Sequence, residues 1–158
     1  MQPAQERARR LRSTIRLKGA PDDRALDALL AGSGLAVLER CPLPGPVREV
    51  YAAGLLGIRA GLSPEWVRWL KAHGLAHHLL HRGNHLYAEG KLYLWHRQEI
   101  EAELFAGELF FADLVGTPLT LDALAAAACV PLACVHSWQA ASVYAHEVGL
   151  RRSANTLG

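Results

Sequence analysis

The sequence is poor in the features that mark several broad classes of protein. Its cysteines are Cys41, Cys129 and Cys134, an odd number without paired spacing, so a disulfide framework is not expected. The first residues contain no apolar segment of the kind found in a secretory signal. The uncharged run 123–135 is too short to span a bilayer and contains Pro131. We therefore expect a cytoplasmic protein in a reducing setting, without a membrane segment.

A large excess of charge of either sign is also absent. The chain has 17 Lys and Arg against 15 Asp and Glu, and its net charge of +2 identifies no partner. Residues 1–18 are an exception, because their only acidic residue, Glu6, stands among six basic ones: Arg7, Arg9, Arg10, Arg12, Arg16 and Lys18. We interpret this stretch as a solvated, basic N-terminal helix, with nucleic-acid contact as the less favoured alternative.

Periodicity and turn residues predict a mainly helical α+β chain. Apolar spacing and capping residues predict helices over residues 4–16, about 23–32, 64–81 and about 94–114. Strand-like segments are a short one at 35–38, a hairpin within 47–60, and a loop or short ribbon at 84–92. We divide the chain into a core, residues 1–118, and a small helical C-terminal region, residues 119–158.

The C-terminal region resembles a helix-turn-helix, with two short helices joined by a tight turn at residues 129–131. The second of these, Leu132 to Gln139, lacks arginine and has few polar groups that could contact base edges. A plain packing role is therefore favoured over DNA reading.

What the chain does have is a group of five histidines within thirteen positions: His73, His77, His78, His81 and His85. The helix that begins at Ser63-Pro64 places His73 and His77 four residues apart, and therefore on one face. Two imidazoles held in this way can bind one zinc ion from one side. We expect His78 and His85 in solvent. His81, one turn further along the same face, either supports the metal ligands or simply packs.

A zinc site needs a third protein ligand if one position is to remain open. Glu99, on the next predicted helix, is the best candidate because a loop and one helical turn fit between it and His77. Glu101 and Glu103 are alternatives, although Glu101 would point about 200° away from Glu99 on a helix. The alternative without a metal site is that the histidines are ordinary surface or core residues.

These motifs, in this order and at this spacing, resemble the ImmA/IrrE family of zinc metallopeptidases. The family's active helix has the pattern A-H-E-L-G-H-x-L-L-H, and this chain has Ala-His-Gly-Leu-Ala-His-His-Leu-Leu-His over residues 72–81. The family's second motif, E-x-x-A-x-x-F-A-x-x-L-L, is similar to residues 99–110, Glu-Ile-Glu-Ala-Glu-Leu-Phe-Ala-Gly-Glu-Leu-Phe. Residues 61–64, Gly-Leu-Ser-Pro, resemble the family's entry to the active helix. The resemblance covers roughly residues 45–145.

The resemblance implies that His73, His77 and Glu99 hold zinc, and that one ion is bound per chain. It implies a gluzincin-like fold, in which a small antiparallel sheet packs on the active-site helix. It also implies a protein substrate, such as a DNA-binding repressor.

Gly74 departs from the family pattern, because the family has its general base, a glutamate, at this position. Glycine can neither accept nor pass on a proton, and such groups contribute about 10²–10⁴ in rate. Zinc alone still polarises a carbonyl, so slow residual hydrolysis is compatible with the sequence. Three explanations stay open: a natural pseudo-protease, replacement of the base by another carboxylate or a water, or an engineered or accidental glycine.

Two further interpretations do not need zinc hydrolysis. In one, the scaffold is a metal-free module that binds a protein or DNA, as Gly74, the basic N-terminus and the C-terminal helices suggest. In the other, which we favour least, the chain is a structural α+β domain with incidental histidines.

Overall fold

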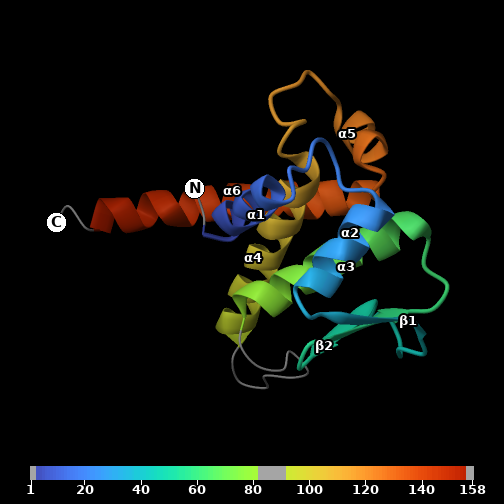
Figure 1. Ribbon diagram of the computed structural model, residues 1–158. Helices are drawn as coiled ribbons and strands as arrows, with labels where there is room; N and C mark the ends of the chain where they lie inside the picture. Colours follow the sequence, from blue (N-terminus) through green and yellow to red (C-terminus); the bar gives the residue numbers. More distant parts are fainter. Residues whose placement is uncertain (1–2, 82–91, 156–158) are drawn as a thin grey trace.

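The computed structural model describes residues 3–81 and 92–155, with the side chains of 3–81 and 96–148 (Figure 1). The described elements, in chain order, are α1 Pro3–Thr14, α2 Asp23–Gly32, β1 Ala36–Cys41, β2 Glu49–Ala52, β3 Leu55–Arg59, α3 Pro64–Leu80, α4 Leu92–Phe111, α5 Leu121–Ala128 and α6 Leu132–Asn155. This part of the chain is α+β and mainly helical, as predicted. The ribbon or loop predicted at 84–92 lies almost entirely outside the described residues.

The sheet is mixed, so the prediction of an antiparallel sheet is wrong for one of its two pairings. Strands β2 and β3 form the expected antiparallel hairpin, but β1 pairs with β3 in parallel, which gives the order β1-β3-β2. Strands β1 and β2 are consecutive in the sequence but not adjacent in the sheet, because β3 lies between them. Strand β3 then runs in the same direction as β1, because a tight hairpin reverses the chain.

Helix α3 lies between the sheet and α4, as the layers in Figure 1 show. It begins where the sequence predicts, since the Ser63 side chain accepts a hydrogen bond from the backbone N–H of Trp66 and Pro64 follows the cap. On one side it packs against buried residues of β3. On the other, the Trp69 ring stacks on Phe110 and Phe111 of α4, with centroid distances of 5.7 and 5.9 Å. Both long helices are thereby fixed relative to one another.

Helix α1 is basic and begins and ends near its predicted limits, but the expectation that it is merely solvated is wrong. Ala4 and Ala8 are fully buried against the core. Arg12 is 6% exposed and pairs with Asp113, with 2.6 Å between Nη2 and Oδ2. It also donates to the backbone carbonyl of Leu109, near the end of α4. One face of α1, which contains Ala4, Ala8 and Arg12, therefore packs against the rest of the protein, whereas the opposite face is exposed to solvent.

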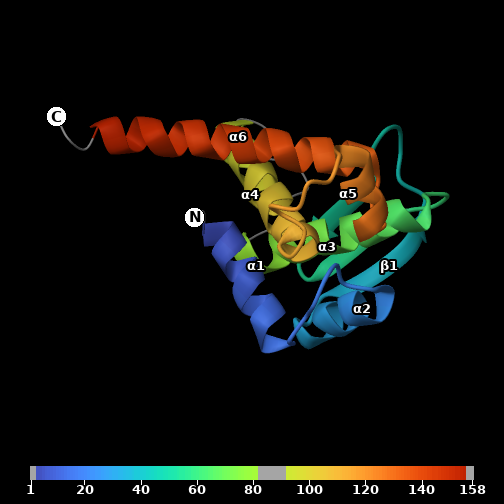
Figure 2. The ribbon, with the colours of Figure 1, turned by 90° about the horizontal axis from the view of Figure 1, so that it is seen from above.

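Helices α5 and α6 are joined by a tight turn, as predicted, and their axes differ by 114°. The second helix is not short, however, because it runs from Leu132 to Asn155. It crosses α4 where Trp138 lies over Gly107, and its C-terminal end extends past the rest of the described chain (Figure 2). The boundary at residue 118 stays a prediction.

Among the described residues, no single helix is both long enough and apolar enough to cross a membrane, although α5 with Leu132–Val148 passes that test as one bent pair.

Candidate metal centre

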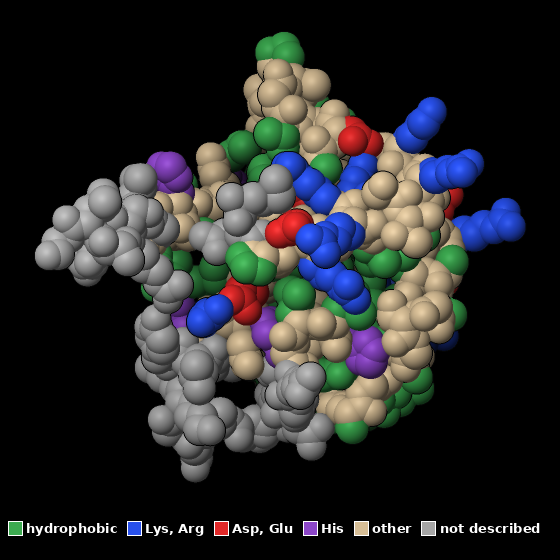
Figure 3. Space-filling view, turned by 60° about the vertical axis from the view of Figure 1, so that its left-hand side comes forward, with side chains coloured by type: hydrophobic (Ala, Val, Ile, Leu, Met, Phe, Trp, Pro, Cys, Tyr) green, Lys and Arg blue, Asp and Glu red, His purple; other side chains and the backbone are tan. Residues whose placement is uncertain are grey.

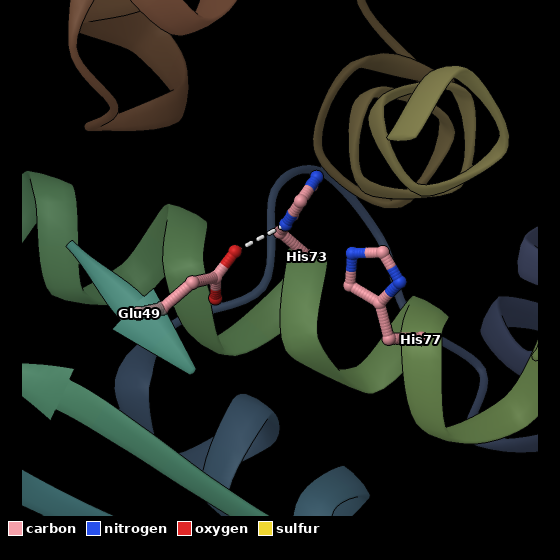
Figure 4. Close-up of side chains that lie close together, drawn as sticks. All are labelled: Glu49, His73 and His77. Atoms are coloured by element: carbon pink, nitrogen blue, oxygen red, sulfur yellow. Dashed lines mark hydrogen bonds and ion pairs between the residues drawn. The ribbon is translucent and has the colours of Figure 1, made fainter. Parts of the chain in front are cut away.

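Three elements bring histidines and carboxylates to one place. Strand β2 supplies Glu49, and α3 supplies His73 and His77, whose rings lie 4.8 Å apart between centroids (Figure 4). Ligand atoms of these three residues all lie within 4.8 Å of one another. His73 and His77 are 5% and 4% exposed, so the group is buried. Such a cluster of imidazole and carboxylate groups can hold a metal ion.

Helix α4 adds the carboxylate that the sequence predicts. The distance from His73 Nε2 to Glu99 Oε2 is 3.6 Å, and that from His77 Nε2 to Glu99 Oε1 is 3.4 Å. Ligand atoms around a tetrahedral zinc ion lie about 3.3–3.5 Å apart, given bonds of about 2.0–2.1 Å. Glu99 therefore lies near both histidines, with a different carboxylate oxygen facing each ring, whereas the donor atoms that all lie within 4.8 Å of one another are those of Glu49, His73 and His77.

The opposite edges of the two imidazoles are held by hydrogen bonds. His73 Nδ1 bonds to Glu49, and His77 Nδ1 lies 3.1 Å from His81 Nδ1. His81 Nε2 in turn lies 3.0 Å from Glu101 Oε2. When His81 donates to Glu101, its Nδ1 accepts from His77. Both metal-facing edges are then Nε2, the arrangement that outer partners of metal-binding histidines typically impose.

Several buried polar atoms of this site have no hydrogen-bond partner. In the described part of the chain, five buried side-chain nitrogen and oxygen atoms lack a hydrogen-bond partner. Three of them belong to this cluster: Glu49 Oε2, His73 Nε2 and Glu103 Oε2. Unpaired buried polar groups are costly and normally rare. Their concentration at one point, together with nitrogen and oxygen donors, is what a divalent metal would satisfy.

Without a metal, the carboxylates shift the proton affinities of their neighbours. Burial lowers the pKa of His73, but the charge and hydrogen bond of Glu49, with the charges of Glu103 and Glu99, outweigh it and raise that pKa to about 9. Burial raises the pKa of Glu103 to about 7, against the opposing effect of His73. The cluster therefore retains protons that a bound cation would displace.

Gly74 faces the sheet at very close range. A Cβ atom on this glycine would lie 2.5 Å from both Cδ1 and Cδ2 of Leu56, which is fully buried in β3. The sequence alone offers no local benefit from this glycine, but the packing explains it, because only glycine lets α3 approach β3 so closely. Leu56 occupies the space beside Gly74, so that space is not open to a substituting water.

The structure confirms some of the other predictions made for this region and contradicts others. His81 has the supporting contacts that were one of its two expected roles. His78 is not in solvent, because its Nδ1 lies 3.0 Å from the Tyr51 hydroxyl and its Nε2 lies 2.8 Å from the Ser33 carbonyl oxygen. His85 lies outside the described residues. Glu49 was missed, since no spacing links it to the histidines; its polar position at the start of a predicted strand was the only signal.

Comparison of the chain with protein-family models, curated proteins and solved structures gives no match to any of them.

Proposed function

We propose that this protein is a zinc-binding domain of the metallopeptidase type, similar to ImmA/IrrE proteins, in which hydrolysis by the usual general-base route is lost. One observation supports this most strongly. The Nε2 atoms of His73 and His77 both face Glu99, at 3.6 and 3.4 Å, and the buried His73 Nε2 has no hydrogen-bond partner. When bound, zinc would act as a Lewis acid held by these three residues.

Glu99 is preferred to Glu49 as the third ligand. Glu49 contacts His73 at Nδ1, on the edge of the ring opposite Nε2. A carboxylate in that position orients the imidazole and increases its basicity, as outer partners do in zinc sites. Glu99, in contrast, lies on the Nε2 side of both histidines, with one carboxylate oxygen near each Nε2 atom.

Loss of the general base is supported by the packing of Gly74 on Leu56. The side chain that a metallopeptidase needs there has no room next to β3. We therefore propose that the domain acts by binding a protein, such as a DNA-binding repressor, rather than by cutting it efficiently. The free thiols of Cys41, Cys129 and Cys134 suit a reducing, cytoplasmic setting.

The test is metal analysis of protein incubated with zinc and then dialysed. We expect about one zinc ion per chain, lost in His73→Ala and Glu99→Ala. His136→Ala is the matched control, because His136 is an exposed histidine on α6. Peptidase activity towards a peptide library should stay near background in the loaded protein. Absence of zinc would contradict the ligand assignment, whereas rapid, zinc-dependent cleavage would contradict the loss of catalysis.

The second candidate function is a metal-free interaction module. It is favoured by the ion pairs His73–Glu49 and His81–Glu101, which give the buried imidazoles partners without a cation. In this case a chelator would leave both stability and partner binding unchanged.

If the partner of that module were DNA, the exposed basic side chains would have to supply the contact. Arg7 and Arg10 of α1 are exposed, and several Lys and Arg side chains project from the face in Figure 3. Helix α6 contains no Lys or Arg before Arg151, so its start is unsuited to phosphate contact. DNA binding that weakens steeply with salt would support this candidate.

A further inference from the structure

Glu103 lies beside the metal centre without a role in the three-ligand arrangement. It follows Glu99 by four residues on α4, so the two carboxylates share a helix face, as His73 and His77 do on α3. Glu103 Oε1 is 3.9 Å from His73 Nε2. Two histidines one turn apart thus face two glutamates one turn apart.

The contacts of Glu103 do not account for its burial. Its side chain is 22% exposed, and among the described residues its one ion-pair partner is His73. Its second oxygen, Oε2, is buried without a hydrogen bond. The same is true of His73 Nε2, on a side chain that is 7% exposed. A buried carboxylate oxygen and a buried imidazole nitrogen, both without a hydrogen bond, are two groups that one cation could bind together.

Most of the charged side chains described around Glu103 are carboxylates. The charges that act on Glu103 are those of His73, Glu99 and Glu49, of which only His73 is favourable. Three carboxylates, those of Glu49, Glu99 and Glu103, therefore lie around the two imidazoles of His73 and His77. A divalent cation placed among them would relieve the repulsion between the carboxylates and satisfy the unpaired oxygen.

We propose that Glu103 is a fourth protein ligand of the same cation, giving a donor set of His73, His77, Glu99 and Glu103. This inference rests on the proposed metal site and makes it more specific. Four protein ligands complete the tetrahedral coordination of zinc, the arrangement of structural sites, whereas catalytic sites keep one position for water or substrate. The centre then stabilises the α3–α4 pair and has no open position for a substrate carbonyl. Together with Gly74, this makes the protein a metal-stabilised binding domain.

The test uses the protein reconstituted with Co²⁺, whose visible absorption reports on coordination. In the wild-type protein we expect a tetrahedral spectrum that azide does not change, because no position is open to an added anion. In Glu103→Ala, azide should bind and alter the spectrum. Glu103→Gln should lower Co²⁺ affinity by more than the roughly 10–100-fold that loss of an outer partner costs. Glu108→Gln is the matched control, since Glu108 lies on the same helix but pairs with Arg9.

The possible failures can be told apart. A wild-type protein that takes up neither Co²⁺ nor Zn²⁺ would contradict the metal site as a whole, and with it this inference. A wild-type protein that binds Co²⁺ but responds to azide would leave the metal site intact and overturn the role of Glu103. An affinity of Glu103→Gln within about 100-fold of that of the control would do the same, since loss of an outer partner accounts for a fall of that size.

Discussion

Leu56 lies where the side chain of residue 74 would have to be, with its methyl groups 2.5 Å from the position of a Cβ atom on Gly74. We expect Gly74→Ala to destabilise the protein by up to about 2 kcal/mol. Overpacking costs about 1–3 kcal/mol, and the better helix propensity of alanine offsets about 1 kcal/mol of it. Urea denaturation measures the difference.

The control for this substitution is Gly32→Ala, because a Cβ atom there meets nothing within 4 Å. Leu56→Ala combined with Gly74→Ala should cost less than the sum of the two changes, since the smaller residue makes room for the new methyl group. Gly74→Glu should be more destabilising than alanine and should not create a peptidase. A fully stable, proteolytic Gly74→Glu protein would contradict the packing described for α3 and β3.

Glu49 and His81 are expected to tune metal affinity rather than to bind the metal. Removing either hydrogen-bond partner, by Glu49→Ala or His81→Ala, should lower zinc affinity by about 10–100-fold, because the imidazole it orients is released. Glu49→Gln should recover part of the loss, since its amide oxygen still accepts from His73. Competition with a chromophoric chelator measures these affinities. If Glu49→Ala removed zinc as completely as His73→Ala does, Glu49 would be a ligand itself.

The stability of the metal-free protein should fall as pH rises from about 4.5 to about 9. The pKa of Glu103 is raised from 4.5 to about 7 and that of His73 from 6.5 to about 9, so the folded state binds more protons than the unfolded state in this window. Each contribution is full below the unfolded pKa and lost above the folded one. At about 1.4 kcal/mol per pKa unit, the loss from His73 is roughly 3–4 kcal/mol at most.

Denaturation in the presence of chelator at pH 5, 7 and 9 measures this dependence. With zinc bound the decline should be smaller, because the metal replaces the protons that are lost. Stability of the metal-free protein that rises across the window would contradict the buried cluster of carboxylates around His73.

Arg12→Ala is expected to destabilise the protein by about 2–3 kcal/mol, because it removes a charged, buried donor from the Leu109 carbonyl and from Asp113. Arg10→Ala is the control. Arg10 pairs with Glu6, at 71% and 53% side-chain exposure, and such surface pairs contribute little. Thermal unfolding of the two variants compares them. Equal effects would show that α1 is not docked through Arg12.

The local parts of this structure were predictable from sequence. Asp22 and Ser63 each cap a helix through the hydrogen bond that their residue type favours. The i,i+4 spacing of His73 and His77 places them together by helix geometry alone. Glu99 could be chosen as a candidate because a second helix had to supply a ligand and its motif marked the position, and its role as a ligand stays a prediction.

The remaining features depend on contacts between segments that sequence patterns do not relate. Strand β1 pairs in parallel with β3 rather than with β2, which comes next in the sequence. The alternation of apolar residues along a strand does not specify which strand becomes its neighbour. Glu49 reaches His73 only because β2 lies against α3. Nothing within helix α3 explains a glycine at position 74. The explanation is the contact with Leu56 of β3, which the sequence pattern does not reveal.

The most direct test of the metal centre is X-ray absorption at the zinc edge of the reconstituted protein. We expect about one zinc ion per chain, bound by nitrogen and oxygen atoms at about 2.0–2.2 Å, with the outer scattering of two imidazoles. The spectrum should be lost in His73→Ala and kept in His136→Ala. Failure to bind zinc, or a first shell containing sulfur at about 2.3 Å, would contradict the assignment of His73, His77 and Glu99 as its ligands.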